Sequence, residues 1–346
     1  MKDIITLQQK IVPELIELIE RRYTILRHVS HSQPVGRRVL AHDLRLGERI
    51  VRSELDFLKG QGLLEGDLSG VKLTGDGELM IHELSDFIKD LRGLVDIENS
   101  LRERLGLKQA IVVPGDSDSD ESVKKELGRV ASRHLLGVLK EGSIIAVTGG
   151  TTVGEVANAV PISYNPRDLL LVPARGGLGE EVEIQANTIA AKIAKRLKAQ
   201  YRLLHVPDNI GEDAMNSLNR DPHIKDIIKT IKSADILVHG IGNAREISAN
   251  RDDSPEKTKW LIDSGSVGEA FGHYFAKNGT IIWTIHSLGI RLNDLKKIDH
   301  VIGVAGGRKK AAAILAVCSS GSETVLVTDE GAGRAMLEQL NEVEIN

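Results

Sequence analysis

The stretch 144–152, IIAVTGGTT, joins an apolar β-branched run to a segment with a helical pattern. Gly149 and Gly150 end the run, and Thr151 and Thr152 open the helical segment. The first N–H groups of a helix lack partners within it, and its dipole is positive at that end, so the junction attracts anions. Glycine lets a phosphate approach the backbone, and threonine hydroxyls can donate to it. An ordinary βα turn capped by threonine fits the pattern equally well.

Beyond residue 105 the chain alternates between predicted strands and predicted helices. Continuous apolar strands separated by helices are typical of a parallel sheet covered on both faces, so we predict a Rossmann-like α/β domain. We also predict an inserted hairpin over 280–291 and a helix over 268–275, GEAFGHYF. The predicted strands are 110–113, 144–148, 169–173, 201–206, 235–239, 301–305 and 324–327, and the predicted helices include 122–140, 183–198, 224–232 and 309–317.

Ligands of an open parallel sheet bind outside the carboxyl ends of its strands. A second glycine pair, Gly306 and Gly307, follows the sixth predicted strand and precedes Arg308, Lys309 and Lys310, which gives a second candidate anion site. Arg175 follows the third predicted strand. Two anion sites and an arginine favour a ligand with a phosphate at each end, such as a sugar bisphosphate.

Two further polar residues are candidates for binding sugar hydroxyls, because amides and carboxylates bond to such groups. They are Gln185 and Glu269. Each has a plainer interpretation. Gln185 would otherwise be a solvent-facing helix residue, and Glu269 a first-turn acid that the helix dipole favours.

The N-terminal region has a different pattern. A helix is predicted over 10–30, followed by a short helix over 37–44, a turn at 45–47 that contains glycine, and a helix over 48–60. Two helices joined by such a turn are typical of a helix-turn-helix, and the alternation over 62–74 predicts a β-hairpin, hence the winged variant. Val51, Leu55 and Leu58 share one face, which we expect to be buried. The predicted DNA-contacting residues are Arg37, Arg38, Arg49, Arg52, Ser53 and Asp56.

Charge supports DNA as a partner only locally. The 346-residue chain carries a net charge of −4, yet residues 21–59 hold nine Lys and Arg against four acids. Basic charge gathered on a small unit is what binding to a phosphate backbone requires. A solvated charged face on a small helical bundle is the alternative.

The chain is long enough for two domains, which we place at 1–90 and 91–346. One long helix is predicted over 77–105, and its apolar stripe could form a coiled-coil seam between two copies or pack on its own domain. A homo-oligomer, dimer or tetramer, would carry two DNA-reading units to successive half-sites.

Several classes of function find no support. The sequence has no apolar run long enough for a membrane helix and no signal-peptide pattern at its start, so we expect a cytoplasmic protein without a membrane partner. The lone Cys318 lies in an apolar helical run and is expected to be buried. No P-loop, metal-binding or serine-hydrolase motif occurs, and the run HGIGNAR departs from a dinucleotide fingerprint. We therefore expect no metal, no cofactor and no catalytic residue.

Five phrases together resemble the SorC family of bacterial transcription regulators. They are RRVLAHDLRLGERIVRSELDFLKGQGLL, VTGGTT, VPARGGLGEEVEIQANTIA, LVHGIGNA and VTDEGA, and the resemblance spans nearly the whole chain. It implies a repressor with a winged helix-turn-helix, a linker helix and an effector domain of the sugar-phosphate isomerase and deaminase fold. In the family's glycolytic members the effector is fructose 1,6-bisphosphate, which weakens operator binding. The resemblance implies an effector site of Gly149, Gly150, Thr151, Thr152, Arg175, Gln185, Arg251, Glu269 and Lys310.

Two other functions stay open at this point. One is an enzyme, a sugar-phosphate isomerase or deaminase with Glu269 or Asp329 as base, for which the sequence offers no clear acid partner. The basic N-terminal unit would serve no purpose there. The other is a scaffold with two interaction surfaces, which leaves the paired anion sites unexplained.

Overall fold

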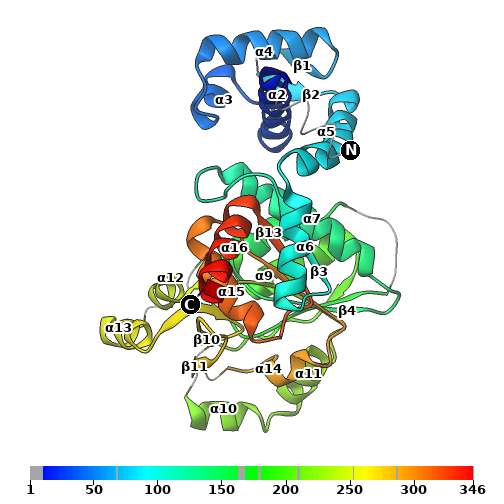
Figure 1. Ribbon diagram of the computed structural model, residues 1–346. Coiled ribbons are helices and arrows are strands. Elements are labelled where there is room, and N and C mark those ends of the chain that lie inside the picture. Colours follow the sequence, from blue (N-terminus) through cyan, green and yellow to red (C-terminus); the bar gives the residue numbers. More distant parts are fainter. Residues whose placement is uncertain are drawn as a thin grey trace. The chain divides into compact units, whose positions relative to one another are not determined.

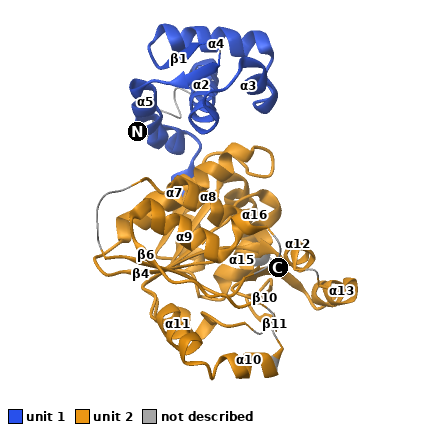
Figure 2. Cartoon of the chain, turned by 180° about the vertical axis from the view of Figure 1, so that it is seen from behind, with its two compact units in different colours: residues 1–96 blue, residues 97–346 orange. Residues whose placement is uncertain are grey.

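The computed structural model describes residues 11–67, 69–162, 168–177, 181–208, 211–251, 253–285 and 287–345. The chain forms two compact units that divide between Asp96 and Ile97 (Figures 1 and 2). Within the described ranges, no helix is long and apolar enough to cross a membrane.

The first unit is a winged helix-turn-helix, as predicted. Its helix-turn-helix consists of α3 (Arg37–Asp43) and α4 (Glu48–Gly60), and α2 (Pro13–Ser32) precedes it. The wing is the antiparallel pair β1 (Leu64–Asp67) and β2 (Gly70–Leu73), with Leu64 opposite Leu73. Val51, Leu55 and Leu58 of α4 are buried, which confirms the expected inner face of this helix.

The predicted single helix over 77–105 is wrong. Two helices, α5 (Gly75–Leu91) and α6 (Leu94–Leu105), replace it, and Gly93 between them has φ +66°, a left-handed conformation that ends a helix. Ile81 and Ile88 of the apolar stripe are buried in the core of the first unit. In this chain the stripe therefore packs on its own unit, which was the alternative to a coiled-coil seam.

The second unit is built on a parallel sheet of seven strands in the order β3-β13-β12-β7-β4-β5-β6. All seven predicted strands are present, although β6 has only two residues where 201–206 was expected. Each neighbouring pair is parallel. The strands are β3 (Gln109–Val113), β4 (Ile144–Val147), β5 (Leu170–Pro173), β6 (Gln200–Tyr201), β7 (Ile236–Gly240), β12 (His300–Val304) and β13 (Val325–Asp329).

Helices cover both faces of this sheet, which explains its apolar strands. Residues of α7 (Glu121–Val138), α8 (Thr151–Ala159) and α9 (Ala186–Leu197) share one apolar cluster with alternate residues of the strands. The intervening strand residues, such as Ala146 and Leu237, are also fully buried. α11 (Pro222–Lys232), α15 (Ala311–Ser319) and α16 (Glu330–Ile345) complete the layers, and Cys318 is buried in α15 as expected (Figure 1).

A second, antiparallel sheet in the order β11-β10-β9-β8 corrects two predictions. The expected helix over 268–275 is instead a hairpin of β9 (Ser266–Ala270) and β10 (His273–Ala276). The expected hairpin over 280–291 is wrong, because β11 (Ile281–Thr284) is the one strand among the described residues of this range and it pairs back onto β10. β8 (Gly242–Asn243) joins this sheet to the chain that leaves β7.

Close packing of α7 on α8 gives a test of the fold. A Cβ atom at Gly128 would lie 2.5 Å from the carbonyl carbon of Glu155, whereas at Gly137, on the same helix, it would meet nothing within 4 Å. We expect Gly128→Ala to lower the free energy of unfolding by about 1–3 kcal/mol through overpacking. Gly137→Ala should raise it by about 0.5–1 kcal/mol, because alanine favours a helix. Urea unfolding followed by circular dichroism measures both, and a stabilised Gly128→Ala would contradict this packing.

Candidate functional site

The strand order reverses between β4 and β7. From β4 the sheet continues through β5 and β6 on one side, and β7 lies on the other side of β4 with β12 and β13 beyond it. Such a switch point leaves a crevice at the carboxyl ends of the two strands, where ligands of open α/β sheets bind. The predicted anion site at Gly149 and Gly150 lies at this point, directly after β4.

The βα turn after β4 is shaped as the sequence suggested, with one difference. Gly150 has φ +120°, and a Cβ atom at Gly149 would lie 2.7 Å from the carbonyl oxygen of Ile184, so both positions require glycine. The N–H of Gly150 donates to that same oxygen at 2.9 Å and is therefore not a donor for a ligand. Thr151 and Thr152 begin α8, whose first N–H groups have no acceptor within the helix.

The second predicted anion site, at residues 306–310, is wrong as a backbone site. Its N–H groups already have internal acceptors: Gly307 donates to Asp329 Oδ2 at 2.8 Å, and Lys309 to Asp118 Oδ2 at 2.8 Å. A Cβ atom at either glycine would collide with one of these carboxylates. The turn therefore binds the protein's own anions, although it lies at the same sheet edge as the first site, after β12.

Lys310 is the one predicted site residue of this turn, and it is half-buried. Burial lowers the pKa of Lys310, and the carboxylate of Glu246 on α12 (Ala244–Asn250) acts in the opposite direction, as does Asp118. Lys124 of α7 adds to the lowering. Lys310 thus lies among α7, α12 and the acidic loop before α7.

Three predicted site residues come together in one buried cluster of ion pairs. Glu269 Oε1 lies 3.4 Å from Arg175 Nη1 and 2.9 Å from Arg251 Nη2. The fourth member is Asp208, which the sequence analysis missed: Arg251 Nη1 lies 3.2 Å from Asp208 Oδ2, and Arg175 Nη2 pairs with the same oxygen. Two guanidinium groups and two carboxylates, all with side chains at most 9% exposed, leave the cluster without net charge.

Each member of the cluster comes from a different part of the sheet edge. Arg175 follows β5, Asp208 follows the irregular chain after β6, Arg251 caps α12, and Glu269 lies on β9. The rule that selected Arg175, a charged residue beyond the carboxyl end of a predicted strand, applies equally to Asp208. That signal was therefore present in the sequence.

The β9–β10 turn holds Glu269 in place. Phe271 and Gly272 have φ +55° and +80°, and the N–H of Gly272 donates to Glu269 Oε1 at 2.7 Å. The Phe271 ring packs against buried His239 of β7, with 4.1 Å between ring centroids. A non-glycine residue in the left-handed region is costly and persists where packing enforces it, as this contact does.

Gln185 connects the βα turn to the ion cluster. It follows Ile184, whose carbonyl oxygen accepts from Gly150, and it precedes α9. Its Oε1 lies 3.3 Å from the position that a Cβ atom on Gly177 would take. The carbonyl oxygen of Gly177 in turn accepts from the N–H of Asp208 at 2.8 Å. Gln185 is thus placed between the two parts of the candidate site and is not a solvent-facing helix residue.

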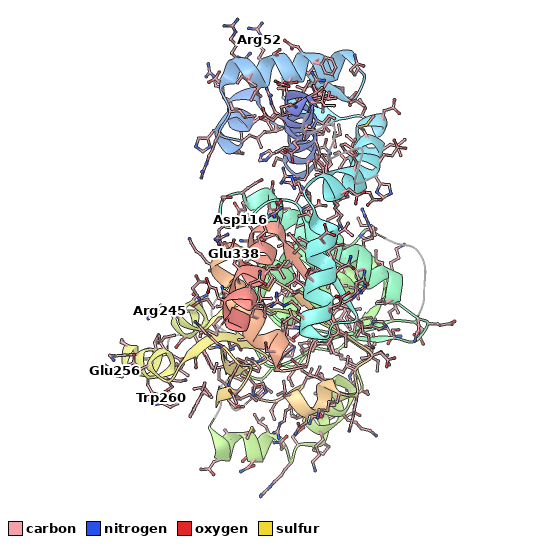
Figure 3. All side chains as sticks on the ribbon, viewed as in Figure 1. Arg52, Asp116, Arg245, Glu256, Trp260 and Glu338 are labelled. Atoms are coloured by element: carbon pink, nitrogen blue, oxygen red, sulfur yellow. The ribbon has the colours of Figure 1, made fainter. Side chains whose placement is uncertain are left out.

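The predicted DNA-contacting side chains of the first unit are all exposed on α3 and α4. Arg52 extends from the outer face of α4 (Figure 3), with its Nε 3.9 Å from Asp56 Oδ2. The local excess of basic charge is smaller at the surface than in the sequence, because Arg27 is buried and Arg21 and Arg22 pair with buried Glu54. The exposed basic residues of this stretch are Arg37, Arg38, Arg45, Arg49, Arg52 and Lys59.

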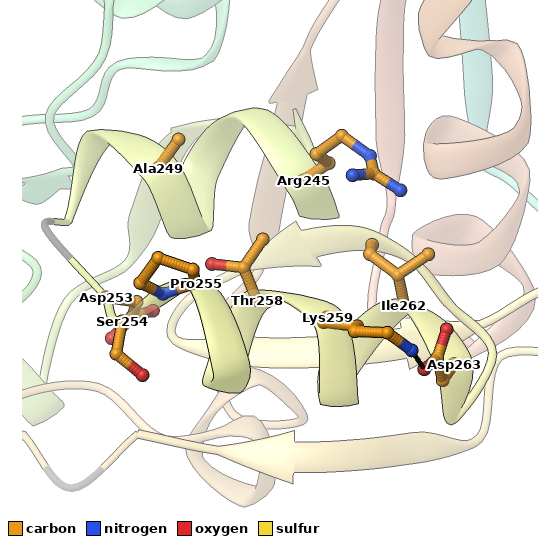
Figure 4. A pocket seen from close by; sticks show the side chains of 9 residues that line it. All are labelled: Arg245, Ala249, Asp253, Ser254, Pro255, Thr258, Lys259, Ile262 and Asp263. Atoms are coloured by element: carbon orange, nitrogen blue, oxygen red, sulfur yellow. Dashed lines mark hydrogen bonds and ion pairs between the residues drawn. The ribbon is translucent and has the colours of Figure 1, made fainter.

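A surface groove of 590 Å³ lies between α12 and α13 (Pro255–Asp263), and its lining includes no member of the ion cluster (Figure 4). It contains none of the predicted effector residues, and Lys259 on its rim pairs with Asp263. Among the residues that the structure describes, no group of three or more His, Cys, Asp or Glu side chains could hold a metal ion.

A winged helix-turn-helix and a parallel sheet with an arginine-lined edge define a DNA-binding regulator with a ligand-binding domain. The profile of the family described as "Putative sugar-binding domain" matches residues 89–338, and that of the "CggR N-terminal DNA binding domain" matches 18–88. The chain therefore belongs to the SorC family of sugar-binding transcriptional regulators.

Relatives and solved structures agree with this assignment. The chain is 43% identical to the central glycolytic genes regulator of Bacillus subtilis, over 97% of this chain and 99% of the relative. It is 42% identical to the regulator of that name from Priestia megaterium, over 99% of this chain and 100% of the relative. A crystal structure described as a "putative SorC family transcriptional regulator" from Enterococcus faecalis is 37% identical, with a TM-score of 0.66, over 70% of this chain and 99% of that one. The fold is shared with full-length SorC of Klebsiella pneumoniae, which is 22% identical. The match has a TM-score of 0.68 and covers 92% of this chain and 98% of that one.

His273, next to the ion cluster, gives a pH test. Burial, and to a lesser extent Arg175, lower the pKa of His273, while Glu269 acts in the opposite direction. In the unfolded chain a histidine has a pKa of about 6.5. Below that pH the unfolded state therefore binds a proton that the folded state does not. The contribution of His273 to stability is therefore complete above about pH 6.5 and decreases as the pH falls. His273→Gln should make the pH dependence of the free energy of unfolding less steep between pH 5 and 7. An unchanged slope of this pH dependence would contradict the prediction.

Proposed function

We propose that this protein is a repressor of glycolytic genes whose operator binding is relieved by fructose 1,6-bisphosphate. The first unit binds double-stranded operator DNA, and the second binds the effector and shifts the chain between homo-oligomers, dimer or tetramer. The observation that carries the proposal is the combination, in one chain, of an exposed basic α4 with a buried arginine cluster and a glycine-led helix start at the same sheet edge. The similarity to the central glycolytic genes regulators supports the class of target gene.

In this proposal the effector lies along the crevice between β4 and β7. One phosphate binds in the turn of Gly149, Gly150, Thr151 and Thr152 at the start of α8, where the glycines leave room for it and the helix dipole and the threonine hydroxyls favour it. The other end lies toward Arg175 and Arg251, whose planar guanidinium groups suit a phosphate. Gln185 and Glu269 take sugar hydroxyls, and Lys310 contributes its ammonium group.

The enzyme alternative has no comparable support. Glu269 is paired with two arginines, and Asp329 accepts bonds from Ser117, Gly307 and Ala332 in a fully buried position. Burial raises the pKa of Asp329, but its oxygens already accept hydrogen bonds from three residues of the protein and its side chain is fully buried, so it is not placed to take a proton from a substrate. Regulation by DNA binding in the cytoplasm uses both units, whereas sugar-phosphate turnover would leave the first without a role.

The DNA-binding part is tested with Arg52→Ala. Loss of one exposed guanidinium group from α4 should weaken operator binding by about 1–3 kcal/mol and reduce the salt dependence of the affinity by about one phosphate contact. Lys195→Ala, which removes one exposed cation from α9 of the second unit, is the matched control and should bind operator normally. Fluorescence anisotropy at several salt concentrations measures both. Equal affinity of Arg52→Ala and the wild type would exclude Arg52 from the interface.

The effector part is tested with Arg175→Ala and Thr152→Ala. Both should bind operator as the wild type does but respond at least tenfold less to fructose 1,6-bisphosphate, because each loses a donor to the ligand. Arg202→Ala, which breaks an ion pair with Asp226 outside the cluster, should keep the full response. Operator titrations with and without the bisphosphate, combined with sedimentation, give the affinity and the oligomer size. If fructose 1,6-bisphosphate changes neither the operator affinity nor the oligomer size of the wild type, the switch is refuted.

A further inference from the structure

The two arginines of the proposed effector site already bind an anion, the carboxylate of Asp208. Its Oδ2 pairs with Nη2 of Arg175 and lies 3.2 Å from Nη1 of Arg251, and its Oδ1 accepts from Nε of Arg175 at 3.3 Å. The Asp208 side chain is 0% exposed. Nε and Nη of one guanidinium group thus contact the two oxygens of one carboxylate, which is the paired geometry that arginine also offers to a phosphate.

The charge of the cluster does not allow a phosphate simply to be added. Arg175 and Arg251 balance Asp208 and Glu269 in a buried environment, so a dianion placed beside them would meet two carboxylates in a region of low dielectric. A buried anion without a matching cation is strongly disfavoured. A phosphate can therefore bind these arginines only if one of the two carboxylates moves away from the guanidinium groups.

The structure distinguishes between the two carboxylates. Glu269 lies on β9 and has a third donor, the N–H of Gly272, in a tight turn that Phe271 packs against His239. Asp208 lies outside regular secondary structure and is held to the sheet edge by its own N–H, which donates to Gly177. Each carboxylate accepts three hydrogen bonds, but all three at Asp208 come from the two arginines, whereas Glu269 would also lose the N–H of Gly272, which a phosphate on the arginines does not replace.

We propose that Asp208 is a specificity-determining residue that occupies the arginine pair in place of a phosphate until the effector replaces it. The inference rests on the proposed function, since it concerns the same site. A competing carboxylate lowers the affinity for every anion, so weak anions such as inorganic phosphate or sulfate fail to bind. A sugar bisphosphate, anchored also at the start of α8, has enough binding energy to displace it.

Asp208→Asn tests the competition, because it keeps the size of the side chain and removes its charge. We expect fructose 1,6-bisphosphate to bind this variant about tenfold more tightly than the wild type in calorimetric titrations, since the net charge of the site rises by one. Inorganic phosphate should raise the melting temperature of Asp208→Asn but leave that of the wild type unchanged. Asp226→Asn, which neutralises an aspartate paired with Arg202 outside the cluster, should behave as the wild type.

The outcomes separate this inference from the proposed function. If the wild type binds no sugar bisphosphate, both are overturned. If the wild type binds it but Asp208→Asn binds it equally or more weakly, the function stands and the competition is rejected, with weaker binding assigning Asp208 to the sugar hydroxyls. Should Asp208→Asn fail to fold, a crystal structure of the wild type with the bisphosphate decides, because a bound ligand beside intact Asp208–Arg175 and Asp208–Arg251 pairs contradicts displacement.

Discussion

Two buried guanidinium groups impose the main constraint on the sheet edge that carries the candidate site. Arginine keeps its charge even when it is buried, so Arg175 and Arg251 need carboxylates at hydrogen-bond distance. Asp208 and Glu269 meet this need from separate segments of the chain. The turn at Phe271 in the small antiparallel sheet holds Glu269 beside the arginines. The hydrogen bond from the Asp208 N–H to the Gly177 carbonyl oxygen holds Asp208 there. The local shape of the domain follows from charge balance as much as from the apolar core.

The same principle explains why two glycine pairs at one sheet edge differ. Both turns present backbone N–H groups, but those of residues 307–309 already bind Asp116, Asp118 and Asp329, whereas α8 begins with Thr151 and Thr152. An anion-binding turn that carries internal carboxylates stabilises the fold, because its donors are satisfied without a ligand. The turn after β4 can instead serve an external anion. Which role a turn takes depends on the acids that the fold brings to it.

Local patterns predicted most of the framework. Apolar strands, helical periodicity and the glycine-containing turn between two short helices are properties of neighbouring residues, so the seven strands, the helix-turn-helix and the wing were all foreseen. The errors have local causes too. GEAFGHYF has apolar residues at helical as well as alternating positions, and only the positive φ angles at Phe271 and Gly272 decide for a hairpin. Gly93 interrupts a helical pattern that is otherwise continuous.

The candidate site was harder to predict because its determining contacts are not local. Asp118 lies 191 residues from the N–H of Lys309 that it accepts from, and Asp208 lies 33 and 43 residues from its two arginines. No spacing rule connects such pairs. A resemblance identifies residues that contact a ligand in relatives. A carboxylate that competes with the ligand for the arginines makes no such contact, so a resemblance does not point to it. The structure pairs Asp208 with both buried arginines, and this long-range pairing, which no local pattern signals, is what the proposed competition rests on.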